Sequence, residues 1–332
     1  MFIPEYLISA KVLQNISAIE YSKAIIDTTP LLENLELQLV KKTKTEKITA
    51  LLKLEGYLFP EEFIKKRIEN LLDKSHVEVE NVIKAIDLAK YLLDDKELEV
   101  ESLKLLHKSL ADKIIFESGN LRDTPDINYI PYEEILAKLY DVLDWFYSKD
   151  ARDTHPLIAC NILLARLIQI KPFKRFNACV LLILFDELLT KRGYSFKSYA
   201  SFVDFFSYHF QKNTLEQYIG SDEDLTHWLE FVTEGMASIV YTLKEEVMLL
   251  AKDTKIAKTS GLVKLTQRQQ RILEYIEDYG ILRNKDFAKL FSDISEDSVL
   301  RDLKALISQG LIIKTGSTKS SCYVLKDSGN LS

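Results

Sequence analysis

The sequence has few of the residues that interrupt or cross-link a chain. Its 332 residues include 10 Gly, 7 Pro and 3 Cys. So few glycines and prolines leave little material for turns, and long helices are therefore expected. Cys160, Cys179 and Cys322 are scattered, with neither metal-ligand spacing nor the pattern of a disulfide framework. They exclude a small disulfide-stapled secreted domain and are typical of a cytoplasmic protein.

Long apolar runs and a large charge of one sign are also missing. The most continuous apolar run, Ala178 to Phe185, is far too short to cross a bilayer. The N-terminus has no basic region followed by an apolar stretch, so no targeting segment is indicated. The net charge of −6 provides no overall attraction for nucleic acid or for an anionic membrane. We expect no membrane partner, and nucleic-acid binding would need a local basic patch.

Helical periodicity runs through the first 250 residues of the chain. Apolar residues recur at spacings of three and four in 79–89 and 135–146, which predicts amphipathic helices. The segments 155–170 and 178–189 are apolar nearly all round and predict two buried central helices. Residues 224–250 predict one long amphipathic helix.

One stretch, residues 118–133, breaks this helical series. It contains Gly119, Pro125 and Pro131, and a short β-prone run, 127–130, lies between the prolines. We predict a loop followed by a small β-hairpin or flap.

The pattern changes again after a polar, basic segment that ends at Lys264 and is typical of a linker. Thr266 is a suitable cap for a helix, and Gly310 is a suitable C-terminal stop for the last helix. Three helices and a two-stranded hairpin predict a winged helix. The expected helices cover 266–279, 282–291 and 295–310, and the expected strands cover 311–314 and 322–325.

The segment between the two predicted central helices reads KPFKRFNACVLL from 171 to 182. Its Pro172, Phe173 and Asn177 match the signature H-P-F-x-[D/E]-G-N-G-R-x-x-R of the Fic family, which this chain resembles. Other segments are similar to the family in the expected order: LLHKSL at 105–110, the G-x-x-R of Gly119 and Arg122, INYIPYEEI at 127–135, and HPL at 155–157.

The resemblance extends to both ends of the chain. Within residues 48–63, Glu55 and Gly56 fit the inhibitory motif [S/T]-x-x-x-E-[G/N], while Leu51 takes the Ser/Thr position. Many Fic proteins also carry a C-terminal winged helix. The resemblance implies a mainly α fold, a Fic-type helical bundle with a small β-hairpin flap, followed by a winged helix-turn-helix. The implied parts are an N-terminal helical region 1–95, a Fic core 96–250, a linker 251–264 and a winged-helix domain 265–326.

In the family the signature transfers AMP from ATP to a protein hydroxyl, and the His is the general base. Lys171 stands at that position. A lysine that faces solvent is protonated at pH 7 and has no lone pair for the hydroxyl proton. Arg175 stands where an acidic residue holds Mg²⁺, and a guanidinium has no acceptor for a cation. Both replacements predict that AMP transfer is lost.

The phosphate cradle of the signature is altered as well. In the family its glycines permit positive φ and a close approach of phosphate to a helix N-terminus. Phe176 and Ala178 replace these glycines, and Cys179 and Leu182 replace the two arginines. Because Leu182 is uncharged, the partner expected for the inhibitory Glu55 is missing.

Two interpretations of this loop remain open. Lys171, Lys174 and Arg175 beside a helix N-terminus, with Asn177 and Ala178, would suit a nucleotide or phosphate. The chain would then be a divergent adenylyltransferase, or a related nucleotidyl or phosphoryl transferase, that uses ATP and Mg²⁺. The other interpretation, which we favour, is a solvated loop of a pseudoenzyme that needs no cofactor, in which Asn177 only caps the following helix.

Single residues have structural alternatives too. Glu55 would be a surface charge, Arg122 a salt-bridge partner and His155 a helix-end histidine. The flap residues would either receive a protein target by strand addition or cover the core. Those residues are Ile127, Asn128, Tyr129 and Ile130.

The register S-x-x-S-V-x-R-D-L-K-x-L at 295–306 resembles winged-helix regulators. From Gly261 to Lys326 there are 11 Lys and Arg against 8 Asp and Glu, a balance that suits contact with duplex DNA. Glu296 and Asp297 oppose it, so a dimerisation or intramolecular module is the alternative. The expected DNA contacts are Ser298, Arg301, Lys304, Lys314 and Lys319.

Together these patterns predict a cytoplasmic, degenerate Fic-family protein that acts in regulation, including regulation of transcription. Double-stranded DNA and a protein target are its expected partners. A homodimer is implied by the resemblance alone.

Overall fold

The computed structural model describes residues 2–31, 33–69, 71, 76–94, 96–126, 128–220, 224–259, 266–291, 294–308, 311–315 and 321–325. The chain divides into two compact units: the larger contains the residues up to Leu249 apart from a short segment that ends at Asn34, and the smaller contains that segment and the residues from Leu250 on. None of the helices within the described residues is long and apolar enough to span a bilayer.

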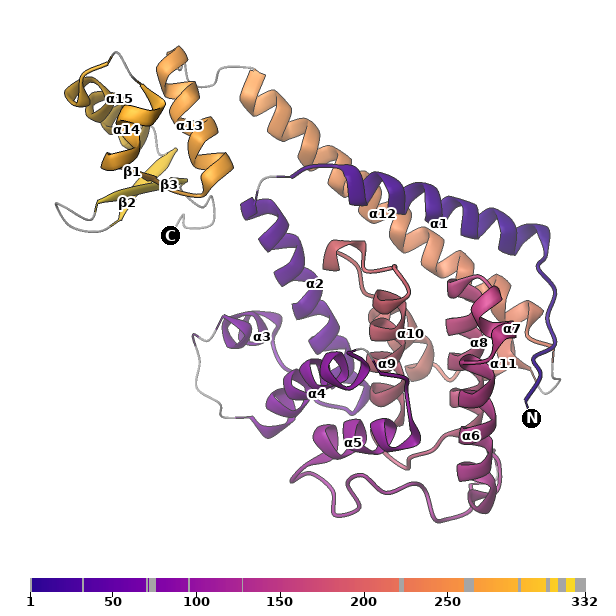
Figure 1. Ribbon diagram of the computed structural model, residues 1–332. Coiled ribbons are helices and arrows are strands. Elements are labelled where there is room, and N and C mark those ends of the chain that lie inside the picture. The colour runs from indigo at the N-terminus through magenta and orange to yellow at the C-terminus, as the bar shows by residue number, and fades with distance from the viewer. Residues whose placement is uncertain are drawn as a thin grey trace. The chain divides into compact units, whose positions relative to one another are not determined.

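The larger unit consists of helices joined by loops and short 3-10 turns, so the prediction of a mainly α fold is confirmed (Figure 1). Its helices are α1 (Ala10–Thr28), α2 (Glu33–Leu54), α3 (Glu61–Ile68), α4 (Val77–Leu93), α5 (Val100–Ala111), α6 (Ile135–Phe146), α7 (Lys149–Asp153), α8 (Pro156–Ile170), α9 (Asn177–Lys191), α10 (Val203–Gln211), α11 (Leu215–Ile219) and the part of α12 (Thr226–Thr259) up to Leu249. The 3-10 turns are η1 (Tyr132–Glu134) and η2 (Phe196–Ser198).

The centre of this unit is the antiparallel pair α8 and α9, the two helices predicted to be buried. Most of their residues are buried, because each helix is apolar on nearly every face. Helix α6 packs on α8, while α4, α5 and α10 pack on α9 (Figure 1). The turn between α8 and α9 is therefore held at one end of the core by helices on several sides.

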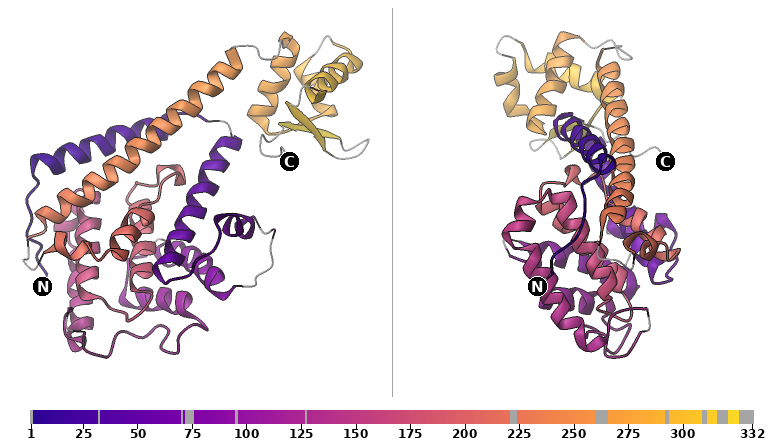
Figure 2. Two further views of the ribbon diagram at one scale, coloured as in Figure 1. Left: turned by 180° about the vertical axis from the view of Figure 1, so that it is seen from behind. Right: turned by 90° about the vertical axis from the view of Figure 1, so that its right-hand side faces the viewer.

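Helices α1 and α12, far apart in sequence, lie side by side (Figures 1 and 2). Polar pairs join their first halves: the Ser9 hydroxyl donates to Glu230 at 2.6 Å and the Asn15 amide to Thr233 at 3.1 Å. Helix α12 continues through Thr259, so the segment predicted as a linker is helical over 251–259. Residues 260–265 lie outside the described residues.

The predicted β-hairpin flap is not formed. Over 118–126 and 128–131 the backbone makes turns and irregular loop, with no strand among these described residues. The Tyr129 N–H donates to the Asp126 carbonyl at 3.1 Å, and the Asn128 N–H donates to the Asp126 side chain at 3.3 Å. This Asx-type turn uses donors that a strand would offer to a partner, and Pro125 and Pro131 have no N–H to contribute.

The smaller unit contains α13 (Gln267–Tyr279), β1 (Leu282–Arg283), η3 (Asn284–Asp286), α14 (Phe287–Leu290), α15 (Glu296–Ser308), β2 (Ile312–Thr315) and β3 (Cys322–Leu325). The prediction of three helices with a hairpin is confirmed, with two refinements. Residues 282–283 form a third strand, giving the antiparallel order β1-β3-β2. The second helix is consequently shorter than expected.

Local sequence accounts for the start of this unit. Thr266 caps α13 as predicted, and it forms a full capping box because the Gln269 side chain accepts from the Thr266 N–H. The core is closed by apolar residues of all three helices and the sheet, among them Ile272, Leu303 and Tyr323. The predicted Gly310 stop lies outside the described residues.

Candidate functional site

Residues 171–176, called here the signature turn, connect α8 to α9 through two left-handed positions. Lys171 ends α8 with φ 46°, and Phe176 precedes α9 with φ 55°. Left-handed backbone costs a side-chain-bearing residue roughly 1–2 kcal/mol. The turn therefore keeps a shape that glycine would adopt freely, although it contains no glycine.

Arg122 holds the signature turn against the loop before it. Its guanidinium donates to the carbonyls of Lys171 at 3.3 Å, Thr124 at 3.0 Å and Ile130 at 2.8 Å. Its own N–H donates to the Pro172 carbonyl at 2.7 Å. The interpretation of Arg122 as a salt-bridge partner was wrong, since this buried side chain is satisfied by backbone carbonyls.

His107 of α5 holds the other end of the signature turn. The Gly119 N–H donates to its Nδ1 at 2.8 Å, so Nε2 carries the proton and donates to the Arg175 carbonyl at 3.1 Å. The ring stacks on Phe173 at 4.1 Å between centroids. Burial lowers the pKa of His107 to about 4, because water no longer stabilises the charged form.

Gly119 makes that contact possible. Its φ is +89°, and an added Cβ would lie 3.2 Å from the Cβ of Lys108 on α5. Only glycine combines this backbone angle with so close an approach to the helix. The G-x-x-R segment thus has a structural basis, since Arg122 bonds the turn directly and Gly119 bonds His107, which in turn donates to the Arg175 carbonyl.

Two lysines of the signature turn are paired with carboxylates from the preceding loop. The Lys171 ammonium lies 2.8 Å from Asp126 and 4.0 Å from the centre of the Tyr129 ring. The Lys174 ammonium lies 2.7 Å from Asp123. These donors lower the pKa of both aspartates, as expected when a cation binds the charged form.

The arginine of the turn is paired as well. Arg175 lies 3.6 Å from Glu55, whose side chain is 12% exposed. Burial raises the pKa of the Glu55 carboxyl, and the charge of Arg175 and the N–H of Phe176 lower it in part. The expectation that Glu55 has no partner, and the alternative that it is a surface charge, were both wrong. The expected partner at position 182 is replaced by the guanidinium at 175.

Asn177 does not cap α9. Phe176 is the N-cap residue, and Asn177 is the first residue of the helix. The Asn177 side chain accepts the Phe173 N–H at 3.2 Å, so it closes the signature turn from within. The prediction that Asn177 caps α9 was wrong, because Phe176 occupies the N-cap position in the left-handed region and provides no side-chain acceptor.

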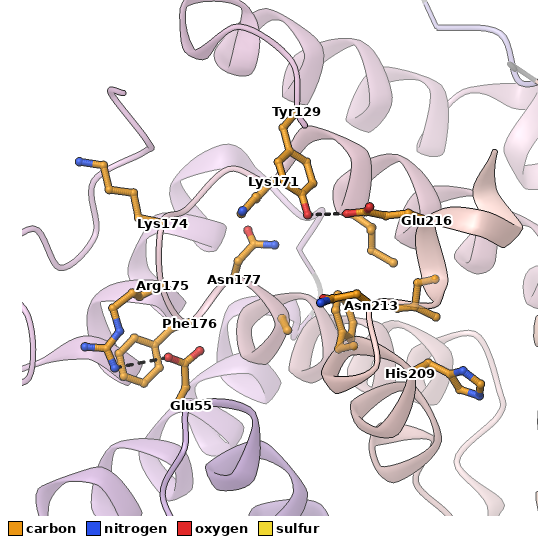
Figure 3. A pocket seen from close by; sticks show the side chains of 14 residues that line it. Glu55, Tyr129, Lys171, Lys174, Arg175, Phe176, Asn177, His209, Asn213 and Glu216 are labelled. Atoms are coloured by element: carbon orange, nitrogen blue, oxygen red, sulfur yellow. Dashed lines mark hydrogen bonds and ion pairs between the residues drawn. The ribbon is translucent and has the colours of Figure 1, made fainter. Parts of the chain in front are cut away.

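A cavity of about 230 Å³ lies beside the signature turn (Figure 3). Tyr129 and Glu216 meet on one side of it, with the Tyr129 hydroxyl 2.6 Å from the carboxylate, and Glu55 and Arg175 meet on another. Apolar side chains of α8, α10 and α11 contribute to its wall. The lining residues are Glu55, Tyr129, Ile168, Lys171, Lys174, Arg175, Phe176, Asn177, Ala178, His209, Phe210, Asn213, Leu215 and Glu216.

Three solved structures of Fic proteins are similar to this chain. A Fic family protein from Desulfovibrio desulfuricans matches with a TM-score of 0.63 at 18% identity, over 99% of this chain and 100% of its own. A Fic domain containing signaling protein from Bacteroides thetaiotaomicron matches with a TM-score of 0.55 at 16% identity, over 74% and 98%. Fic-1 from C. elegans matches with a TM-score of 0.57 at 14% identity, over 72% and 73%.

The chain has the Fic fold. Residues 268–319 of the smaller unit match the family model of the DeoR-like helix-turn-helix domain. No curated protein is similar enough to the sequence to match it. The predicted resemblance is thus confirmed for the fold and for the C-terminal module.

The Fic fold brings most of the predicted site residues together. Lys171, Lys174, Arg175, Asn177 and Ala178 line one cavity, as do Glu55 and Tyr129, although Lys174 points away from the other labelled side chains (Figure 3). Asn128 belongs to the Asx-type turn at Asp126, and the Ile130 carbonyl accepts from Arg122. Neither residue lines the cavity. Ile127 lies outside the described residues.

The groups around the cavity offer no general base at the signature position. Lys171 forms an ion pair with Asp126, and an ammonium has no lone pair to accept a hydroxyl proton. Burial raises the pKa of the Cys179 thiol well above its usual value, which excludes a thiolate nucleophile. His209 has a lowered pKa because of burial, but its ring points away from Lys171 (Figure 3). Among the described residues no three His, Cys, Asp or Glu side chains gather to hold a metal ion.

Sequence reasoning missed His107, Asp123 and Asp126, which fix or neutralise the turn, and Glu216, which accepts from Tyr129 at the cavity. A signal existed for His107, because it follows Leu103 and Leu106 and precedes Leu110 on the apolar face of its helix. The two loop aspartates and the helical glutamate gave no such signal, since exposed carboxylates are common and the partners of these three lie far away in the sequence.

In the helix-turn-helix unit, the predicted DNA contacts lie on two elements. Ser298, Arg301 and Lys304 lie on α15, and Lys314 lies on β2. Arg301, Lys304 and Lys314 are exposed. Lys319 lies outside the described residues.

Proposed function

We propose that this protein is a DNA-binding regulatory protein whose Fic-type body has lost AMP transferase activity. The body serves as a scaffold or ligand-sensing domain, and the helix-turn-helix unit is its output. The observation that carries the proposal is the charge pairing of the signature turn. Its three cationic side chains, Lys171, Lys174 and Arg175, each face a carboxylate of the same chain.

This pairing weakens the case for phosphate binding. A phosphate cradle works because unpaired N–H groups and cations meet the anion. Here every cation of the turn is already neutralised, and a triphosphate would have to displace Asp126, Asp123 and Glu55. Displacement would also leave Glu55, a largely buried carboxylate, without its cation.

Magnesium does not fit the residues that are present. The signature position that would bind it is the guanidinium of Arg175, which repels a divalent cation and has no acceptor atom. The carboxylates of Glu55, Asp123 and Asp126 are each occupied by a cation of the turn. We therefore derive no reaction step through Mg-ATP, and the divergent transferase is not the function that we propose.

Labelled ATP tests the catalytic part. The full chain is incubated with MgATP labelled on the α-phosphate, alone and with cell extract, and nucleotide binding is titrated by calorimetry. We expect no transferred label and no saturable binding at millimolar ATP. A variant that combines Lys171→His and Arg175→Asp with Phe176→Gly returns three signature residues to the turn and reports whether binding can be recovered.

Two results of these assays would contradict the loss of transferase activity. Self-labelling by the natural chain, or nucleotide binding that Lys171→Ala abolishes, would show that the cationic turn is a working nucleotide site. Lys191→Ala, a lysine at the far end of α9, is the matched control for loss of one positive charge.

The proposal of DNA binding is supported by the DeoR-like helix-turn-helix match and by the exposed cations of α15 and β2. A mobility shift with random duplex fragments at low salt tests it. Lys304→Ala combined with Lys314→Ala should weaken binding and reduce the slope of log affinity against log salt by about one unit for each phosphate that the variant no longer neutralises. Absence of any shift at low salt would remove this part of the proposal.

A homodimer completes the proposal, because helix-turn-helix proteins commonly place two units on two half-sites. Light scattering of the full chain with and without duplex measures the mass directly. A monomer in both states would contradict the dimer and leave the DNA-binding proposal to the shift assay.

A further inference from the structure

The outer face of α15 is left free by the way the helix packs. Val299, Leu303 and Leu306 enter the core of the helix-turn-helix unit. Asp302 is buried beside them and accepts from Arg268 and from the Gln269 amide of α13. These contacts fix the rotation of α15, since a turn of the helix about its axis would unpair Asp302 and expose the leucines.

Three residues at helical spacing lie on the face that remains: Asp297, Arg301 and Lys304, all exposed. No hydrogen bond or ion pair joins any of them to another side chain within the described part of this unit. The other arginines of the first two helices are engaged, Arg268 with Asp302 and Arg271 over the Phe291 ring at 6.0 Å. Arg301 is therefore a free guanidinium on a helix held in a fixed orientation.

The charges on the other elements suit the DNA backbone. Lys285 and Lys289 are exposed around α14, and Lys314 is exposed on β2. In helix-turn-helix complexes the elements beside the recognition helix contact phosphates, and phosphate contacts set register without reading sequence. The residues available to read bases are consequently those on α15.

Two of the three exposed groups on the free face of α15, Arg301 and Asp297, have hydrogen-bonding chemistry that distinguishes bases. Arginine forms two parallel hydrogen bonds with O6 and N7 of guanine, and aspartate accepts from N4 of cytosine. A carboxylate near the backbone would be repelled by phosphate, so Asp297 fits only where it faces a base edge. Four residues of helix rise about 6 Å, which is about two base pairs at roughly 3.4 Å each.

We propose that α15 reads a G·C-containing site in the major groove, with Arg301 on a guanine and Asp297 on a cytosine about two base pairs away. The inference rests on the proposed DNA binding and adds its sequence class. Asp297 also lies in the first helical turn, where an acid stabilises a helix by interacting with its dipole. A role in helix stability alone would leave the base preference unchanged.

Selection from a random duplex library with the full chain tests the assignment, followed by titration of the enriched site and its base substitutions. The natural chain should enrich one guanine and one cytosine at that spacing. Arg301→Ala removes both donors to guanine, so the guanine preference should fall by roughly 5- to 150-fold while non-specific binding through the exposed lysines persists. Asp297→Ala should relax the cytosine preference and tighten binding to sites that lack it.

Glu274→Ala on α13 is the matched control, because it removes one exposed carboxylate from a different helix and should leave every base preference unchanged. If bound duplexes carry no such guanine and cytosine, or if both α15 variants keep the natural preference, the base assignment is overturned while DNA binding stands. If no duplex is retained at low salt, the proposed DNA binding fails and the assignment fails with it.

Discussion

Glu55 and Arg175 form an ion pair at 3.6 Å that joins the end of α2 to the signature turn. The pair is asymmetric, because the Glu55 side chain is 12% exposed and that of Arg175 is 47% exposed. The carboxylate therefore depends on the arginine more than the arginine depends on the carboxylate.

We expect Arg175→Ala to lower the free energy of unfolding by about 1–2 kcal/mol at pH 7, because it leaves a buried carboxylate unpaired. The pKa of Glu55 is already raised in the folded state, and without Arg175 it rises further. A raised carboxyl pKa favours the folded state at low pH and disfavours it as pH rises, so the loss should vanish near pH 4. Urea unfolding at both pH values measures this.

The control for that prediction is Glu55→Gln combined with Arg175→Ala, which removes both charges. It should be more stable at pH 7 than Arg175→Ala alone. Equal stability of the two variants would show that the ion pair contributes nothing.

His107 should make the fold sensitive to acid. Its folded-state pKa is about 4, below the value of about 6.5 for an unfolded histidine. The unfolded chain then binds the additional proton between these two values, so stability is lost as pH falls from 6.5 to 4, by up to about 3 kcal/mol. His107→Gln, which keeps one donor and one acceptor, should flatten this part of the stability–pH curve.

His155 and His209 also have pKa values lowered by burial and contribute to the same window. The comparison is therefore between the natural chain and His107→Gln, with His209→Gln as the matched variant. Identical curves for His107→Gln and the natural chain would contradict the role of His107.

Arg122 should matter for the shape of the signature turn. Arg122→Ala leaves the carbonyls of Thr124, Ile130 and Lys171 without this donor, and we expect a loss of about 2–4 kcal/mol in unfolding free energy. Arg122→Lys should recover only part, because one ammonium cannot reproduce the planar fork. Denaturant unfolding and proteolysis of the loop measure the effect, and Arg152→Ala, at an exposed ion pair of 4.0 Å, should change stability by less than about 0.5 kcal/mol.

Gly235 should resist substitution, although it lies within α12. Alanine in a helix normally adds up to about 1 kcal/mol over glycine. Here an added Cβ would lie 2.3 Å from the Phe205 ring, which is itself packed against Phe206 and Phe231. We expect Gly235→Ala to destabilise by about 1–3 kcal/mol. Adding Phe205→Leu to Gly235→Ala should restore part of the lost stability. A thermal melt in which Gly235→Ala alone unfolds at a higher temperature than the natural chain would contradict the contact.

Local patterns were sufficient for the helices and for the C-terminal module. The apolar sides of α8 and α9 repeat at helical spacing, and Thr266 with Gln269 lies directly before an apolar stripe. These features act between residues that are close in sequence, so their energies can be judged from the chain alone.

Local patterns misled where a segment depends on distant partners. The run at 127–130 has β-prone residues, but the Asx turn at Asp126 and the guanidinium of Arg122 take its backbone groups. Asn177 is a suitable cap by type, yet Phe176 enters the left-handed region and moves the start of α9. In both cases tertiary contacts outweighed a modest local preference.

The sequence alone was enough to show that imidazole, carboxylate and glycines are absent from the signature turn, because residue identity is a property of the chain. Only the tertiary structure decided how the residues that replaced them are paired. Lys171 is paired across 45 residues and Arg175 across 120, and charges that lie so far apart along a chain meet only when packing brings their helices and loops together. The same packing turned a row of three cations into three ion pairs.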